Sequence, residues 1–378
     1  MTTAQLTKAG LEDVVVSTSE ICFIDGHLGR LLYRGFDVDE LVARSNFEEV
    51  VYLLWHGKLP SRKELDTHVK ALSSTANRKL PPKLLSMLKL FPKKTTPMEV
   101  LRTGVSALSA FDPDAADNSR EATLRKSLRL TAQMPTLVAT WERIRRGKAP
   151  VAPNPRLNLA GNFVYMMSGK KPSELATKTF DVALILHADH EFNASTLAAR
   201  VTAATLSDVH SAVVSGIGAL KGPLHGGANE QVMLMVEKIK DPTKAESWMK
   251  KALADKMRVM GFGHRVYRVE DPRAKHLRRL ALELGQQAGS TDAVDILEIV
   301  ARVVSAEKNI FPNVDLFSGA AYKSMGISTD QFTPIFAMSR VVGWAAHVLE
   351  QHGNNRLIRP RAEYTGATAA RYVPLSDR

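Results

Sequence analysis

The chain has 378 residues, more than a single hydrophobic core usually organises, so two packed lobes are expected. Hydrophobic residues make up 44% and charged residues 24%, a balance that excludes a disordered tail and indicates a folded globular protein. Lys and Arg number 51 against 39 Asp and Glu, and the net charge of +12 leaves a nucleic acid, an anionic surface or a polyanionic small molecule open as a partner. The basic residues form only short runs, which argues against a nucleic-acid-binding arm.

The single cysteine, Cys22, excludes an intrachain disulfide and a cysteine-built metal site, and it fits a reducing, cytoplasmic location. No apolar leader segment is visible in the first part of the sequence. The two most apolar stretches, residues 201–220 and 331–349, are interrupted by charged or polar side chains. A membrane span is therefore not expected.

The predicted elements begin with a short β-hairpin, because residues 21–24 and 31–33 are apolar and flank a turn that contains two glycines. Apolar residues then recur at helical spacing over residues 37–56, and a glycine ends that run. Nothing else alternates with period two for long, so the predicted fold class is all-α with a minor β-hairpin. Further helices are expected over residues 62–76, 82–91, 97–111, 120–147, 160–167 and 172–191.

Residues 194–220 are predicted to form a helix-rich part of the core, beginning near the N-cap candidate Asn193 and ending at Gly222. Many Ala, Ser and Gly residues in this segment would let another backbone approach closely. Tight packing within the chain is the simpler interpretation, and a subunit interface is the more specific one.

Four clusters of polar residues are candidates for chemistry, and the first follows an apolar helix. His187 and His190 lie three residues apart, so they would share a helix face and, with Asp189, could serve a metal-dependent hydrolase. No HExxH pattern and no third ligand are evident. A hydrogen-bonded pair of core histidines is the more common meaning of such a pattern.

The second cluster, residues 222–230, is a glycine-rich turn that feeds a helix and puts His225 beside the helix N-terminus. The helix dipole disfavours imidazolium there, so a neutral ring could donate an N–H to a carbonyl oxygen. The alternative is that the glycines serve packing and His225 is only a cap.

The third cluster combines two glycines with many cations. Gly261 and Gly263 do not form a nucleotide-binding glycine motif, because no strand precedes them. Clustered like charges repel unless an anion is bound, so a phosphate- or carboxylate-bearing ligand is favoured over a solvated basic loop. The cations are Lys256, Arg258, Arg265, Arg268 and Arg273.

The fourth cluster centres on Asp315, whose apolar neighbours would raise the pKa of its carboxyl group toward that of a general base. Arg340 lies in an apolar helix with no carboxylate within one turn, so it should meet an anion from elsewhere. Arg359 lies near the C-terminus, where a tail could reach another subunit.

These residues together resemble the active-site pattern of the citrate synthase family, and the likeness runs from about residue 10 to the C-terminus. The matching motifs are residues 187–196 (HADHEFNAST), 222–230 (GPLHGGANE), 261–268 (GFGHRVYR) with 271–273, 312–319 (PNVDLFSG) and 359–366 (RPRAEYTG). The resemblance implies an almost entirely helical homodimer. It also implies a large domain over residues 1–224 and 324–378 and a smaller mobile domain over residues 225–323.

The resemblance further implies a Claisen-type condensation of acetyl-CoA, the co-substrate, with oxaloacetate and water, giving citrate and CoA. Asp315 would take a proton from the acetyl methyl group, His225 would hydrogen-bond the thioester carbonyl, and His264 would protonate the oxaloacetate carbonyl. His190, Arg273 and Arg340 would bind oxaloacetate, with Arg359 supplied by the neighbouring subunit. The residues implied for CoA are Lys256, Arg258, Val259, Met260, Gly261, Phe262 and Arg268.

No metal and no tightly bound cofactor are implied. A 2-methylcitrate synthase that uses propionyl-CoA remains an alternative, because one methylene is worth only about 1–3 kcal/mol of discrimination. A metal-dependent hydrolase and a basic nucleic-acid-binding protein are more remote alternatives from other classes.

Overall fold

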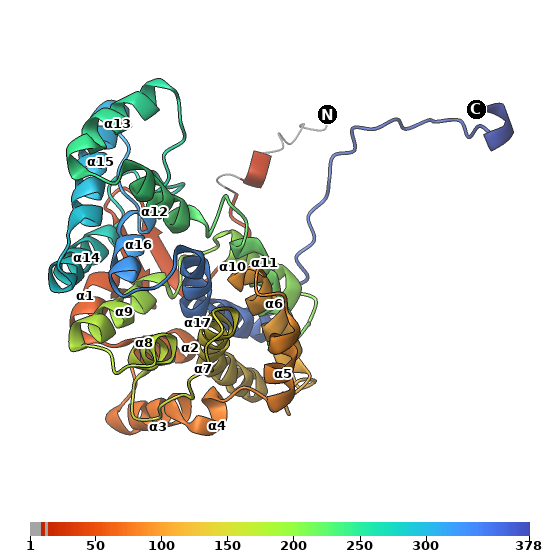
Figure 1. Cartoon of the computed structure of the whole chain (residues 1–378). Helices are drawn as coiled ribbons and strands as arrows, with labels where there is room; N and C mark the ends of the chain where they lie inside the picture. Colours follow the sequence, from red (N-terminus) through yellow and green to blue (C-terminus); the bar gives the residue numbers. More distant parts are fainter. Residues whose placement is uncertain (1–8, 12–13) are drawn as a thin grey trace.

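The computed structural model describes residues 9–11 and 14–378 of the chain. Residues 1–8 and 12–13, which belong to the expected large domain, lie outside this described part. Helices dominate it, and one small antiparallel sheet is present (Figure 1). The expected all-α class with minor β structure is confirmed.

The sheet follows a short 3₁₀ turn, η1 (Ala9–Leu11), and has the order β1-β2-β3. Strand β1 (Cys22–Asp25) pairs with β2 (Arg30–Tyr33), which confirms the predicted hairpin. Strand β3 (Phe36–Asp37) pairs with β2 and was not predicted. Two residues are too few to show an alternating pattern, so the sequence carried no signal for it.

The first helices mostly follow the predicted order, but two predicted runs are each divided in two. The predicted helix over residues 37–56 breaks because the Asn46 side chain accepts a hydrogen bond from Glu49 N and caps a new helix. Ser74 caps another new helix within the expected 62–76 run. The observed helices are α1 (Val38–Arg44), α2 (Phe47–His56), α3 (Arg62–Ser73), α4 (Thr75–Arg78), α5 (Pro82–Leu90), α6 (Pro97–Ser109), α7 (Arg120–Arg145), α8 (Leu159–Ser168) and α9 (Glu174–His187).

The small-residue segment forms two closely packed helices, α10 (Ala194–Ala203) and α11 (Val209–Leu220). Asp208 caps the second helix by accepting from Ser211 N. Gly216 of α11 packs against the ring of Trp344, where a Cβ atom would lie 2.8 Å from the indole. Close packing within the chain therefore accounts for this small residue.

A second group of helices packs chiefly on itself and lies at the upper left of Figure 1. Outside this group, α14 contacts α9 and α12 contacts the last long helix. The members are α12 (Ala228–Ile239), α13 (Pro242–Ala254), α14 (Ala274–Ala288), α15 (Asp292–Lys308) and α16 (Asp315–Ser324).

The last long helix, α17 (Phe332–Gly353), follows the short turn η2 (Thr329–Gln331) and packs against α2, α7, α9, α10 and α11. It is long and apolar enough to cross a membrane by length and composition, but its whole apolar window is buried inside the fold. It is therefore the central core helix, and a charged residue on it needs a local explanation.

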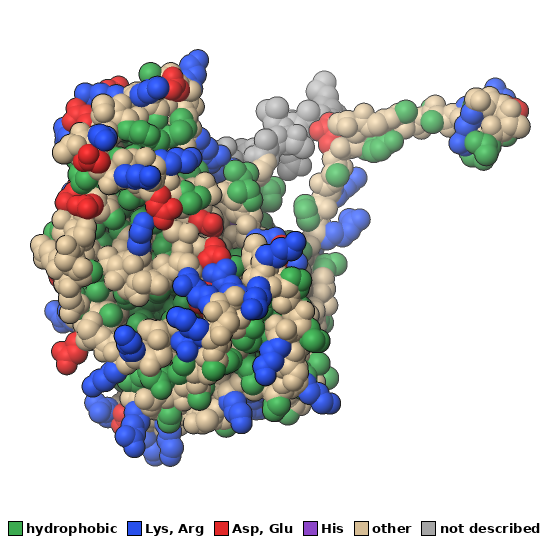
Figure 2. Space-filling model, viewed as in Figure 1, with side chains coloured by type: hydrophobic (Ala, Val, Ile, Leu, Met, Phe, Trp, Pro, Cys, Tyr) green, Lys and Arg blue, Asp and Glu red, His purple; other side chains and the backbone are tan. Residues whose placement is uncertain are grey.

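After α17, residues 354–378 leave the body of the molecule as an extended segment that ends in η3 (Leu375–Asp377; Figure 1). Several large apolar side chains of this tail are exposed, among them Leu357, Tyr364, Tyr372 and Leu375. Lys and Arg side chains are spread over the face of the body seen in Figure 2, with Asp and Glu among them.

Candidate active site

Two loops of the second helix group pair with each other just before two predicted residues, His264 and Asp315. Asn313 N donates to Gly261 O at 2.9 Å, and Gly263 N donates to Phe311 O at 2.9 Å. Gly261 has a φ of +87°, and a Cβ there would lie 2.9 Å from Leu316 Cδ1, so only glycine fits. The pairing holds the segment before His264 against the start of α16.

Arg273 is locked in place immediately before α14. Its Nε and Nη2 donate to the two carboxylate oxygens of Asp271 at 2.9 and 2.7 Å, and both side chains are buried. Asp271 Oδ2 also accepts from Val314 N at 3.3 Å. The same carboxylate therefore fixes an arginine and the chain that leads to Asp315.

Arg340 is 1% exposed on α17. Its Nε donates to His187 O at 2.7 Å, and its Cζ lies 4.7 Å from the centre of the Phe336 ring. Within the part of the chain that the structure describes, it forms no salt bridge. Burial lowers the pKa of Arg340 to about 10, so the guanidinium still carries its charge at neutral pH and remains available to an anion.

His190 follows α9 in a loop and is 7% exposed. It does not share a helix face with His187, because α9 ends at His187. The rings of His190 and His264 are 4.9 Å apart, and His190 Nε2 lies 3.3 Å from Tyr267 Oη. Burial, and next the charge of Arg273, hold the pKa of His190 well below its usual range, so the ring is neutral.

The hydrogen bonds of His264 define its tautomer. Its Nδ1 accepts from Val266 N at 3.0 Å and from Tyr267 N at 3.2 Å, so the proton lies on Nε2. Burial, and next the charge of Arg273, lower the pKa of His264 to about 4. A neutral ring with a free Nε2–H is a hydrogen-bond and proton donor.

His225 is fixed through its other nitrogen. Its Nε2 accepts from Ser195 N at 3.3 Å and lies 2.9 Å from Ser195 Oγ. The proton of His225 is therefore on Nδ1. Burial, and next the charge of Arg340, lower the pKa of His225 to about 4, so the ring is neutral near pH 7.

Asp315 is the first residue of α16, and its Oδ1 is buried without a hydrogen-bond partner in the described residues. Burial raises the pKa of Asp315 to about 7, and the charges of Arg273 and Arg340 only partly oppose this rise. Arg273 and Arg340 are therefore the cations whose charge acts on the Asp315 carboxyl group. A carboxylate that titrates near neutrality is suited to general-base chemistry.

The predicted CoA residues lie on the connection between α13 and α14, on both sides of His264. Lys256, Arg258 and Arg268 are exposed, and none forms a salt bridge within residues 9–11 and 14–378. Val259, Met260 and Phe262 are half-buried and pack against the hydrophobic core. Arg359, by contrast, is exposed in the extended tail.

One support of the site was missed in the sequence analysis, the turn of the N-terminal hairpin. Gly26 O accepts from Arg268 N at 2.8 Å, and a Cβ on Gly26 would lie 2.1 Å from Val266 O. Glycine is required there so that the turn can contact the His264 loop. The glycines of the turn were the available signal, but they did not show what the turn contacts.

No group of three or more metal-ligating side chains that could hold an ion is present in the described residues. His187 Nδ1 lies 2.7 Å from Ala183 O, which is a core interaction. The metal-hydrolase interpretation therefore gains no geometric support from the described residues.

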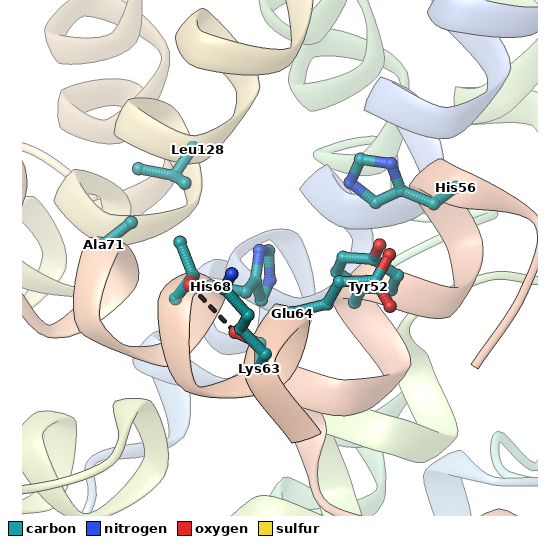
Figure 3. A pocket seen from close by; sticks show the side chains of 8 residues that line it. Tyr52, His56, Lys63, Glu64, His68, Ala71 and Leu128 are labelled. Atoms are coloured by element: carbon teal, nitrogen blue, oxygen red, sulfur yellow. Dashed lines mark hydrogen bonds between the residues drawn. The ribbon is translucent and has the colours of Figure 1, made fainter. Parts of the chain in front are cut away.

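A pocket of about 540 Å³ lies elsewhere, between α2, α3 and α7 (Figure 3). None of its lining residues is a predicted site residue, and we assign it no role. They are Tyr52, His56, Lys63, Glu64, Thr67, His68, Ala71 and Leu128.

The chain is similar to known proteins over nearly its whole length. The family described as citrate synthase, C-terminal domain, matches residues 10–361. A citrate synthase of Haloferax volcanii is 48% identical over 98% of this chain and 99% of its own length. A 2-methylcitrate synthase of Mycobacterium tuberculosis is 44% identical over 95% and 90%.

Solved structures agree with these matches. The citrate synthase of Thermoplasma acidophilum, solved as a ternary complex with carboxymethyl coenzyme A and oxaloacetate, superposes on this chain with a TM-score of 0.91 at 33% identity, and the match covers 98% of both chains. An identity above 30% over nearly the full length, with the same fold, leaves no competing assignment. The chain belongs to the citrate synthase family of acyltransferases.

Proposed function

We propose that the protein condenses acetyl-CoA with oxaloacetate and water to give citrate and CoA. The observation that carries the proposal is the set of shifted titratable groups: burial raises the pKa of the Asp315 carboxyl to about 7 and lowers the pKa of the His225 and His264 imidazoles to about 4. A weakly acidic methyl group needs a base of this kind opposite a donor aimed at the developing enolate oxygen.

In the proposed mechanism, Asp315 removes a proton from the acetyl methyl group. His225 Nδ1–H donates a hydrogen bond to the thioester oxygen and stabilises the enol. The enol carbon then forms the new C–C bond with the oxaloacetate carbonyl carbon, and His264 gives its Nε2 proton to the oxygen of that carbonyl. Water hydrolyses the resulting citryl thioester, which releases CoA as the thiol.

Oxaloacetate is a dianion, and the proposal assigns its two carboxylates to arginines. Arg273 and Arg340 are buried and positively charged, and His190 lies beside His264 as a neutral polar partner. Bidentate arginine–carboxylate pairing would offset the cost of burying the Arg340 guanidinium.

We propose acetyl-CoA as a co-substrate that binds against residues 256–268, with no metal and no tightly bound cofactor in the reaction. The exposed Lys256, Arg258 and Arg268 would bind its phosphates, and the backbone of residues 258–262 would receive the adenine. The ternary complex of the Thermoplasma acidophilum relative contains a coenzyme A derivative and oxaloacetate together, which supports this pair of substrates.

We propose a homodimer in which Arg359 of one copy completes the oxaloacetate site of the other. The exposed tail with its uncovered Leu357 and Tyr364 supports this, because such apolar side chains gain from being covered. Co-expressing Arg359→Ala with Asp315→Ala tests it: random mixing makes half the dimers hybrids, each with one complete site. About a quarter of wild-type activity is expected. No recovery above the two single variants would contradict sharing.

We further propose that residues 225–323 form a small domain that closes on the large one when oxaloacetate binds. Support comes from the self-contained packing of α12 to α16 and from the left-handed Gly326 after α16. Crystals with and without oxaloacetate that show the same interdomain angle would refute closure. We also infer a cytoplasmic location, which suits the buried, unpaired Cys22.

The experiment that tests the function is thiol release from acetyl-CoA, with and without oxaloacetate, and identification of citrate as the product. A 2-methylcitrate synthase remains the second candidate, because such an enzyme is 44% identical to this chain. The ratio of kcat/KM for propionyl-CoA to that for acetyl-CoA separates the two. Thiol release that does not depend on oxaloacetate would overturn the proposal.

A further inference from the structure

The three residues that precede His190 are each held by one face of α17. Arg340 Nε donates to His187 O at 2.7 Å, and Gly343 N donates to Ala188 O at 3.1 Å. One turn later, His347 Nε2 lies 3.3 Å from an oxygen of the Asp189 carboxylate. Residues 340, 343 and 347 share a helix face, so one rigid element fixes the chain as it enters the oxaloacetate site.

This contact requires glycine at position 343. A Cβ atom there would lie 2.3 Å from Asp189 Oδ1 and 2.4 Å from Ala188 O. The close approach brings Asp189 against the helix, and both Asp189 and His347 are fully buried.

The tautomer of His347 follows from its second partner. Arg200 Nη1 lies 3.1 Å from His347 Nδ1, and a guanidinium can only donate, so Nδ1 accepts. The ring proton is therefore on Nε2 and faces the Asp189 carboxylate. Arg200 is itself held by Gln351 Oε1 at 3.0 Å and by the carboxylate of Glu350.

Asp189 in turn restrains His190 from both sides. Its Oδ2 accepts from Glu191 N at 3.2 Å, and Glu191 has a φ of +53°. Its backbone O and N both contact Tyr33 Oη, at 3.0 and 3.3 Å. The peptide that carries His190 is thus bracketed by contacts of residues 189 and 191.

We propose that His347 and Asp189 are positioning residues for oxaloacetate binding, an inference that rests on the proposed function. His347 donates to Asp189 and so keeps that carboxylate away from the nearby Arg340 guanidinium, whose charge interacts with it. Without this donor, the buried carboxylate would turn to Arg340 and compete with the substrate for the same cation.

The test compares two replacements of His347 that fill a similar space. His347→Gln keeps an N–H donor near the Nε2 position, whereas His347→Leu removes it. We expect KM and calorimetric Kd for oxaloacetate to rise about tenfold or more in His347→Leu, with kcat at saturation changed by less than about threefold. His347→Gln should stay within about threefold of wild type.

Two further variants separate positioning from stability. His68→Leu replaces another buried histidine, on α3, and should leave the oxaloacetate Kd unchanged. Adding Asp189→Asn to His347→Leu removes the competing charge and should recover part of the lost affinity.

An oxaloacetate Kd in folded His347→Leu within twofold of wild type would overturn the inference, as would equal losses in the Gln and Leu variants. Wild-type protein that binds no oxaloacetate would instead overturn the proposed function, and this inference with it. The wild-type titration therefore tells the two failures apart.

Discussion

The two halves of the proposed site differ in how much of each the single chain builds. On the oxaloacetate side, His190, Arg273 and Arg340 are 7%, 3% and 1% exposed, and each is held by contacts to its neighbours. On the CoA side, Arg258 and Arg268 are exposed and form no salt bridge within the described chain.

The difference shows which side chains are already held in place for binding in the folded protein. A buried guanidinium is expensive to keep without an anion, so the oxaloacetate side is preorganised at the expense of stability. Exposed cations cost little and gain only when phosphates arrive. Changes on the buried side should therefore have large effects, and changes on the exposed side small ones.

The largest effect is expected from Asp315→Ala, which removes the proposed general base. Thiol release at saturating substrates should fall about 10²–10⁴-fold, because a general base contributes about that much. Circular dichroism should show an unchanged helical fold. Activity within tenfold of wild type would remove Asp315 as the base.

Replacing Arg340 tests the buried half directly. In Arg340→Gln the KM for oxaloacetate should rise about 10²-fold, since removing one partner of a buried charge pair costs about 2–5 kcal/mol. The KM for acetyl-CoA at saturating oxaloacetate should change far less. Equal rises in both constants would show that Arg340 is not specific to the diacid.

The pH profile tests the charge state of the centre. Burial raises the pKa of Asp315 to about 7, so the base is protonated at lower pH, and kcat/KM should fall about tenfold per pH unit below 7. His225 and His264 have pKa values of about 4 and stay neutral over this range. An acid limb centred below pH 5 would indicate a carboxyl of ordinary pKa.

The same raised pKa has a consequence for stability. Ionising a carboxyl whose folded pKa lies above its unfolded value weakens the fold as pH rises through about 7. The Tm of Asp315→Ala relative to wild type should therefore be higher at pH 8 than at pH 5. Thermal melts at the two pH values measure it, and an equal difference at both would contradict burial of an ionised Asp315.

The smallest effects are expected on the exposed half. Lys256→Ala and Arg258→Ala should each raise the KM for acetyl-CoA about three- to fivefold, and added salt should shrink the difference. The KM for oxaloacetate should not move. A change above about 30-fold in either variant would mean that these cations are preorganised like Arg340.

Much of the fold could be predicted from sequence because its signals are local. Apolar periodicity and capping residues predict most helices, and the paired apolar runs predict the hairpin. The break before α2 escaped because Asn46 caps a new helix without disturbing the spacing of the apolar residues. In the sequence, a capping residue of this kind cannot be distinguished from a polar residue on the exposed face of a continuous helix.

The candidate site, too, could be predicted only in part. His225, His264, Asp315 and Arg340 stand out as polar residues in glycine-rich or apolar surroundings. His347 could have been noticed as a polar residue seven positions after Arg340 on an apolar helix, but its partners Asp189 and Arg200 lie far away in sequence. Pairings of this type depend on tertiary packing, which a single sequence does not display.

We expect binding of the diacid and removal of the proton to be separate tasks of separate residues. A calorimetric titration of oxaloacetate into Asp315→Ala tests it most directly. We expect a Kd for oxaloacetate within about threefold of wild type in this variant, which should no longer release CoA. A variant that fails to bind oxaloacetate would contradict this separation, because Asp315 would then contribute to oxaloacetate binding.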